Sequence, residues 1–118
     1  MATSSEIQFE AGEIRGRVAT LRVRGRLDAD TSQLLLQRCA DIQARGQNLI
    51  LNLSEVTFLG STGVGVLLAL VEQFQEQAGV VHLACLSEPA RTVVDVLDLG
   101  EYLSIHASEE DALAATEA

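Results

Sequence analysis

One short segment sets the fold class of this chain. Residues 48–53, Asn-Leu-Ile-Leu-Asn-Leu, are apolar at nearly every position, whereas a strand with one solvated face would alternate apolar and polar residues. The segment therefore predicts a strand that is covered on both faces. Residues 80–86 form a second apolar run of this kind. Helical patterns separate these runs, and strands that alternate with helices predict an α/β fold with at least partly parallel strand order.

Arginines mark the strand that is expected before residues 48–53. Over residues 17–27, apolar positions alternate with Arg22, Arg24 and Arg26. This alternation predicts a half-buried strand with an arginine-bearing solvent face. The face is interpreted either as a solvated strand surface or as a stripe that binds a partner.

Two short strands and four helices complete the expected order. The short strands are expected at residues 7–9 and 102–105, the latter at an edge of the sheet. Helical spacing and capping patterns predict four helices, over residues 30–46, 62–77, 87–100 and from 108 onward. For the first of them, Asp30 followed by Gln33 forms a capping-box pattern.

Length and charge limit the classes of function. The 118 residues predict a single domain over residues 6–118, after a flexible start at residues 1–5. Acidic residues number 17 and basic residues 8, all of them Arg, for a net charge of −9. Nucleic-acid binding needs clustered positive charge, so a nucleic-acid partner is not expected. Without Lys, the chain has no Schiff-base chemistry and no Walker-loop lysine.

The sequence favours the cytoplasm. Its start lacks the positive residues and the apolar run of a secretory signal. The longest nearly uncharged stretch, residues 56–71, is too short and too polar for direct membrane insertion. Cys39 and Cys85 lie far apart and outside any Cys-x-x-Cys pattern, so we expect two reduced cysteines in the core.

A glycine-rich segment surrounds Ser61 where a buried strand gives way to a helix. Residues 56–67 read Val-Thr-Phe-Leu-Gly-Ser-Thr-Gly-Val-Gly-Val-Leu. Free backbone N–H groups and the helix dipole favour negative charge at such a place. A phosphate added to Ser61 would therefore be stabilised. The alternative interpretation is that Ser61 or Thr62 only caps the helix.

Catalytic and cofactor chemistry are not supported at this segment. Its glycines do not follow the dinucleotide-binding pattern, and Leu59 stands where a nucleophile elbow needs glycine. Nucleotide binding there has no basic residue nearby in the sequence to support it. His82 and His106 lie in separate strand-like segments and form no ligand cluster, so no metal site is expected. We expect neither an enzyme nor a cofactor.

Three motifs carry a resemblance to a known family. They are Gly-Arg-Leu-Asp at residues 25–28, Leu-Asn-Leu-Ser at 51–54 and Phe-Leu-Gly-Ser-Thr-Gly-Val-Gly at 58–65. In order and spacing they resemble the STAS domain family, in particular the bacterial anti-sigma factor antagonists, over about residues 6–116. The resemblance implies an α/β STAS fold, a four- to five-stranded mixed sheet packed by about four helices.

The resemblance also implies a mechanism. In antagonists, the serine that aligns with Ser61 is phosphorylated by an anti-sigma factor that is also a serine kinase. The unphosphorylated antagonist binds this kinase and frees the sigma factor, the phosphorylated form is released, and a PP2C-type phosphatase resets the cycle. For this chain the resemblance implies a partner surface at Asp28, Gly60, Ser61, Thr62, Gly63 and Val64. Val66 and Leu70 lie on another face of the expected helix and could also contact the partner, but burial against a second packed element explains their spacing equally well.

Two positions depart from the family pattern. Gly60 stands where the family has an acidic residue before the phosphorylated serine, and Asn52 replaces the strand-end Asp. These departures leave a second function open, a constitutive STAS interaction subunit of a lipid-transport ABC complex or of a stress-sensing assembly. Retention of Ser61, Thr62 and Gly63 favours the phosphorylation switch.

Overall fold

A five-stranded mixed sheet forms the centre of the molecule. The computed structural model describes residues 7–117. The strands lie in sequence order across the sheet: β1 (Ile7–Ala11), β2 (Val18–Leu27), β3 (Asn48–Leu59), β4 (Val81–Ala84) and β5 (Ser104–His106). β1 is antiparallel to β2, and the remaining neighbours are parallel. The expected α/β fold with a mixed sheet of four to five strands and about four helices is confirmed.

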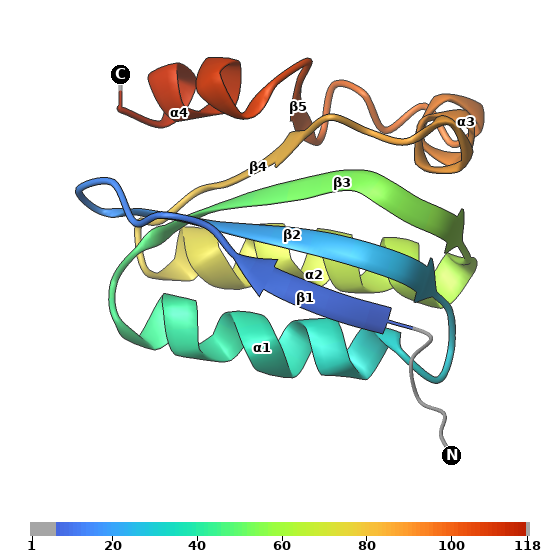
Figure 1. Cartoon of the computed structure of the whole chain (residues 1–118), viewed down its shortest axis with the longest axis horizontal. Coiled ribbons are helices and arrows are strands. Elements are labelled where there is room, and N and C mark those ends of the chain that lie inside the picture. The colour runs from blue at the N-terminus through green and yellow to red at the C-terminus, as the bar shows by residue number, and fades with distance from the viewer. Residues whose placement is uncertain (1–6, 118) are drawn as a thin grey trace.

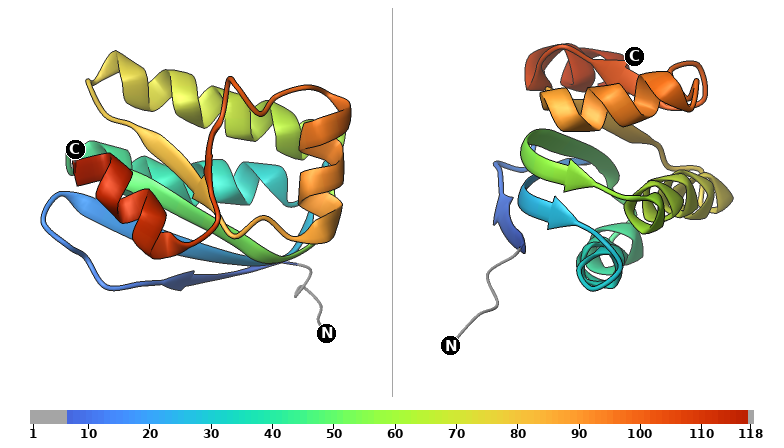
Figure 2. Two further views of the ribbon diagram at one scale, coloured as in Figure 1. Left: turned by 90° about the horizontal axis from the view of Figure 1, so that it is seen from above. Right: turned by 90° about the vertical axis from the view of Figure 1, so that its right-hand side faces the viewer.

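Helices cover both faces of the sheet. The four helices are α1 (Ser32–Ala44), α2 (Ser61–Glu76), α3 (Glu88–Val96) and α4 (Glu109–Glu117). Figures 1 and 2 show α1 and α2 against one face and α3 and α4 against the other. This two-sided cover explains why the first half of β3 is apolar on both faces: Leu49 and Leu51 pack in the main core, whereas Ile50 packs toward α4 with Ala112.

Several boundaries differ from those expected: β1 extends to Ala11, β4 is limited to Val81–Ala84, and β5 begins at Ser104. Three further differences have a clear physical cause. β3 runs to Leu59 rather than ending at residue 53, because the long β2 provides a parallel partner as far as Leu27. α3 ends at Val96 rather than near residue 100, since Asp98 adopts a left-handed conformation and the Leu99 N–H closes the helix on the Val94 carbonyl oxygen at 3.0 Å. The expected flexible start at residues 1–5 lies outside the described residues.

The third difference is the start of α1. Asp30 is not the cap; the helix begins after Thr31, and the backbone N–H groups of Asp30 and Thr31 donate to the carboxylate of Asp28 at 3.0 and 3.1 Å. Asp residues favour such local turns because the short side chain reaches N–H groups two and three positions on. The carboxylate of Asp28 therefore organises the β2–α1 loop.

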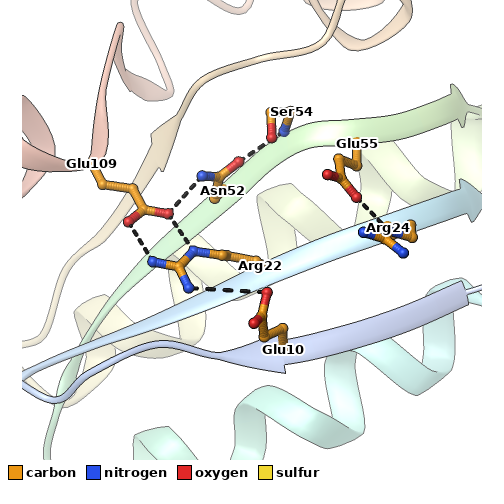
Figure 3. A network of polar contacts seen from close by, with 7 residues as sticks. All are labelled: Glu10, Arg22, Arg24, Asn52, Ser54, Glu55 and Glu109. Carbon is orange, nitrogen blue, oxygen red and sulfur yellow. Dashed lines mark hydrogen bonds and ion pairs between the residues drawn. The ribbon is translucent and has the colours of Figure 1, made fainter.

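One carboxylate fixes α4 to the sheet. Glu109, the first residue of α4, receives two hydrogen bonds from the Arg22 guanidinium at 2.8 and 2.9 Å and a third from the Asn52 amide at 2.6 Å (Figure 3). The Asn52 side-chain oxygen in turn accepts the Ser54 N–H at 2.9 Å. Few apolar side chains hold α4, chiefly Ala112 and Leu113, so this polar contact carries much of its docking. Asn52 thus stands where a carboxylate would repel Glu109.

A change at Glu109 tests this contact. The Arg22 hydrogen bond outweighs burial and lowers the pKa of Glu109, so the ionised carboxylate stabilises the fold above its ordinary pKa of 4.5, and the stabilisation is lost as the pH falls through the lower folded value. Glu109→Gln should lower the free energy of unfolding at neutral pH by about 1–2 kcal/mol. Urea titrations should show this difference narrowing below pH 4.5.

The neighbouring exposed Glu110 supplies the control. Glu110→Gln should leave the free energy of unfolding within about 0.5 kcal/mol of the wild type. If the difference in free energy of unfolding between Glu109→Gln and the wild type stays constant as the pH falls below 4.5, the carboxylate charge does not hold α4.

Candidate functional site

The candidate site lies where β2 and β3 end and α2 begins. The Gly60 N–H donates to the Leu27 carbonyl oxygen at 2.9 Å, which continues the pairing of the two strands by one residue. Gly60 then occupies the cap position of α2 in an extended conformation, with no side-chain hydrogen bond at the cap. Its carbonyl oxygen accepts the Val64 N–H at 3.0 Å, the first bond of the helix. Ser61 is therefore the first residue of the helix and not its cap.

The side chain of Ser61 lies on the surface. Ser61 and Thr62 are exposed in the first turn of α2, where the N–H groups of a helix have no partner within the helix. Since Gly60 is the cap, the interpretation of Ser61 or Thr62 as only an N-cap is wrong. An accessible hydroxyl at a helix start fits a site of phosphorylation, because the helix end favours added negative charge.

A close backbone approach positions this turn. A Cβ at Gly63 would lie 2.9 Å from the Leu27 carbonyl oxygen and 2.8 Å from Cδ1 of Leu59. Both contacts are shorter than normal van der Waals distances, so only glycine allows α2 to lie this close to the end of β2. The same approach brings the turn of Ser61 beside the loop of Asp28, although more than thirty residues separate the two in the sequence.

Matched glycines on α2 test this constraint. Gly63→Ala should lower the free energy of unfolding by about 1–3 kcal/mol, because the added methyl group overpacks the contact with Leu27. The Gly65 position is open, with nothing within 4 Å of an added Cβ. Gly65→Ala should therefore stabilise the helix by about 0.5–1 kcal/mol. Thermal and urea unfolding would measure the free energy of unfolding of both variants. If the two substitutions change it by the same amount, Gly63 has no steric role.

The residues expected at the partner surface divide by exposure. Ser61 and Thr62 are exposed, and Asp28 and Gly60 are half-buried. The other four are buried: Gly63, Val64, Val66 and Leu70. The latter two, 5% and 1% exposed, pack in the main core. They cannot contact a partner, since α2 packs on α1 as well as on the sheet and this second packed element covers their face.

Asp28 directs its carboxylate inward. Burial disfavours its ionised form, but hydrogen bonds from the Thr31 and Asp30 N–H groups, the Thr31 hydroxyl and Arg26 outweigh that effect and lower its pKa. The Arg26 contact joins Nε to Oδ2 at 3.3 Å. Asp28 is thus an ionised group whose Oδ1 accepts from its own loop and whose Oδ2 accepts from Arg26.

The arginine-bearing face of β2 consists of paired charges over most of its length. Arg22 binds Glu109, and Arg24 forms an ion pair with Glu55 of β3 (Figure 3). A hollow of about 300 Å³ lies on this face, lined in part by Gln8, Glu10 and these two arginines. It lies away from Ser61, and its positive groups are balanced by carboxylates, which favours the interpretation of a solvated strand face over an anion site.

Cysteine and histidine side chains form no metal cluster in residues 7–117. Cys39 is buried and Cys85 half-buried, both unpaired, and burial raises the pKa of the Cys39 thiol to about 12. No pattern in the sequence indicates that His82 and His106 meet, yet Nδ1 of His82 lies 2.7 Å from Nε2 of His106 across β4 and β5. The parallel register pairs His82 with Ser104, so His106 is its diagonal neighbour on the same face of the sheet. No group of three or more metal-ligating side chains occurs in the part of the chain that the structure describes.

The sheet order, with β1 antiparallel and the other strands parallel, and the serine at the start of α2 define a small mixed α/β domain. A family model for the STAS domain matches residues 11–112, and the chain belongs to the STAS domain family. Two curated relatives are the anti-sigma F factor antagonist of Paenibacillus polymyxa, 28% identical over 94% of this chain and 96% of the relative, and the anti-sigma-B factor antagonist of Bacillus subtilis, 26% identical over 76% and 83%.

A solved structure supports the same placement. An anti-sigma factor antagonist from Mycobacterium paratuberculosis superposes with a TM-score of 0.84 at 26% identity, over the whole of both chains. Within the described residues, no helix is long and apolar enough to cross a membrane. Family membership and fold thus rest on nearly the full length of the chain.

Proposed function

We propose that this chain is a bacterial anti-sigma factor antagonist that acts by partner switching. The observation that carries the proposal is the exposed hydroxyl of Ser61 in the first turn of α2, with the helix cap provided by Gly60. The relatives at 26–28% identity are antagonists of anti-sigma factors. Unphosphorylated, the chain binds an anti-sigma factor serine kinase through the surface around Ser61, Thr62 and the loop of Asp28.

Phosphorylation of Ser61 ends this complex. A phosphoserine carries roughly two negative charges at neutral pH. In the free chain, the N–H groups at the start of α2 stabilise that charge. In the complex, the same charge lies in a contact surface, where repulsion and desolvation oppose binding. The modification therefore stabilises the free form relative to the complex and releases the partner.

The chain itself supplies no chemistry in this cycle. The kinase partner transfers the phosphoryl group to the Ser61 oxygen, and a PP2C-type phosphatase removes it. We assign the cycle to the cytoplasm. Neither a cofactor nor a metal is needed by the antagonist.

A constitutive interaction subunit is the second candidate. Gly60 replaces the acidic residue of the family motif, and this single observation favours a domain that binds a lipid-transport ABC complex or a stress-sensing assembly without phosphorylation. The two functions differ in how an added negative charge at Ser61 affects the affinity for the partner.

Ser61 variants distinguish the two functions. Ser61→Asp should weaken binding to the ATP-bound anti-sigma factor kinase of the same bacterium by about tenfold or more, because it places part of the phosphate charge in the contact. Ser61→Ala should bind like the wild type and accept no phosphate at this position. Isothermal titration calorimetry measures the affinities, and mass spectrometry after incubation with kinase and ATP locates the phosphate.

A second exposed serine controls for the added charge. Ser104, on the edge strand β5, is exposed, and Ser104→Asp should bind the kinase as the wild type does. If Ser61→Asp also binds with unchanged affinity, the switch is refuted and the constitutive function stands.

A further inference from the structure

A guanidinium stacked on an aromatic ring lies beside the Ser61 turn. Arg26 and Phe58 are paired residues of the parallel strands β2 and β3. The Arg26 Cζ lies 4.3 Å from the centroid of the Phe58 ring, within the range of a cation–π contact. The side chain of Arg26 is 48% exposed and that of Phe58 39%. We call this pair the Arg26–Phe58 platform.

The platform lies against the glycine that departs from the family motif. A Cβ at Gly60 would lie 2.9 Å from Cε2 of Phe58, closer than real Cβ contacts come. A side chain at this position would therefore require the exposed end of the Phe58 ring to shift. Gly60 lets the ring lie close to the Ser61 turn.

Arg26 supplies an exposed cation at the site. Asp28 accepts from Nε of Arg26 at 3.3 Å, and the same carboxylate also accepts from the N–H groups of its own loop. Nε thus faces Asp28, while Cζ lies over the Phe58 ring. Arg and aromatic side chains that lie together on a surface are the residue types that contribute most to binding in protein interfaces.

We propose that the Arg26–Phe58 platform selects the partner of this chain by binding a carboxylate of the anti-sigma factor, packed beside an apolar side chain. This inference rests on the proposed function and adds the chemistry of the partner. A carboxylate accepts two parallel hydrogen bonds from a guanidinium, and the exposed ring provides the apolar area next to it. An anti-sigma factor that presents a basic group at this point would be rejected by like charge.

Charge exchange tests the proposal. Arg26→Glu should weaken binding of the ATP-bound anti-sigma factor kinase by about tenfold or more. The affinity of Arg26→Lys should lie between those of Arg26→Glu and the wild type, since Lys keeps the charge and loses the planar fork.

Arg17→Glu is the matched control. Arg17 is exposed at the opposite end of the sheet, where it donates to the Gly46 carbonyl oxygen. The affinity of Arg17→Glu for the kinase should therefore stay within about twofold of the wild type.

A photo-crosslinker at position 58 identifies the partner group. Benzoylphenylalanine in place of Phe58 should crosslink to a kinase segment that contains Asp or Glu. Exchange of that residue for Arg should restore binding of Arg26→Glu to within about threefold of the wild-type pair. A crosslinked segment without an acidic residue, or a failed rescue, would overturn the proposal.

The outcomes separate this inference from the proposed function. If Ser61→Asp loses binding while Arg26→Glu binds like the wild type, the switch holds and the platform does not select the partner. If Ser61→Asp and Arg26→Glu both bind like the wild type, the partner surface itself lies elsewhere. Arg26→Gln provides a second variant in case Arg26→Glu does not fold: it removes the positive charge from the platform without adding a negative one, so it should weaken binding as well.

Discussion

The close contact between Gly63 and the end of β2 is the constraint on which the site depends. With the Leu27 carbonyl oxygen 2.9 Å from the place of a Cβ at position 63, α2 has no room to shift toward the sheet. Its first turn is tied to the same strand end by the hydrogen bond from the Gly60 N–H to the Leu27 carbonyl oxygen. Ser61 and the loop of Asp28 are thereby brought to one surface from two parts of the chain, and a change of charge at Ser61 acts on that whole surface.

On the opposite face of the sheet, a charged contact adds to the apolar packing that holds α4. Glu109 joins α4 to β2 through Arg22 and to β3 through Asn52. Because Asn52 is neutral, it can donate to Glu109 where an Asp would repel it. The Asn at this position thus has a role in docking α4. Arg26, at the end of β2, is the arginine of this row that lies beside the candidate partner surface, where it pairs with Asp28.

Family relationship and local physics support the switch through different observations. The STAS match and the antagonist relatives concern the whole chain. The exposed hydroxyl of Ser61 and the backbone cap at Gly60 concern one turn. From the sequence alone, Gly60 favours a constitutive subunit. In the structure, the absence of a side chain at Gly60 also leaves space for the Phe58 ring under Arg26.

Periodicity and motifs in the sequence determined the fold class, the order of the elements and the serine at the start of α2, because apolar spacing and glycine positions act locally. They also marked Asp28, although not its part as the acceptor that organises the α1 loop. Only the tertiary structure decided that Val66 and Leu70 are core residues, that β3 reaches Leu59 and that Arg26 stacks on Phe58. Each of these depends on which face a neighbouring element covers or on the register of paired strands, and long-range packing of that kind leaves no pattern in the residues of a single segment.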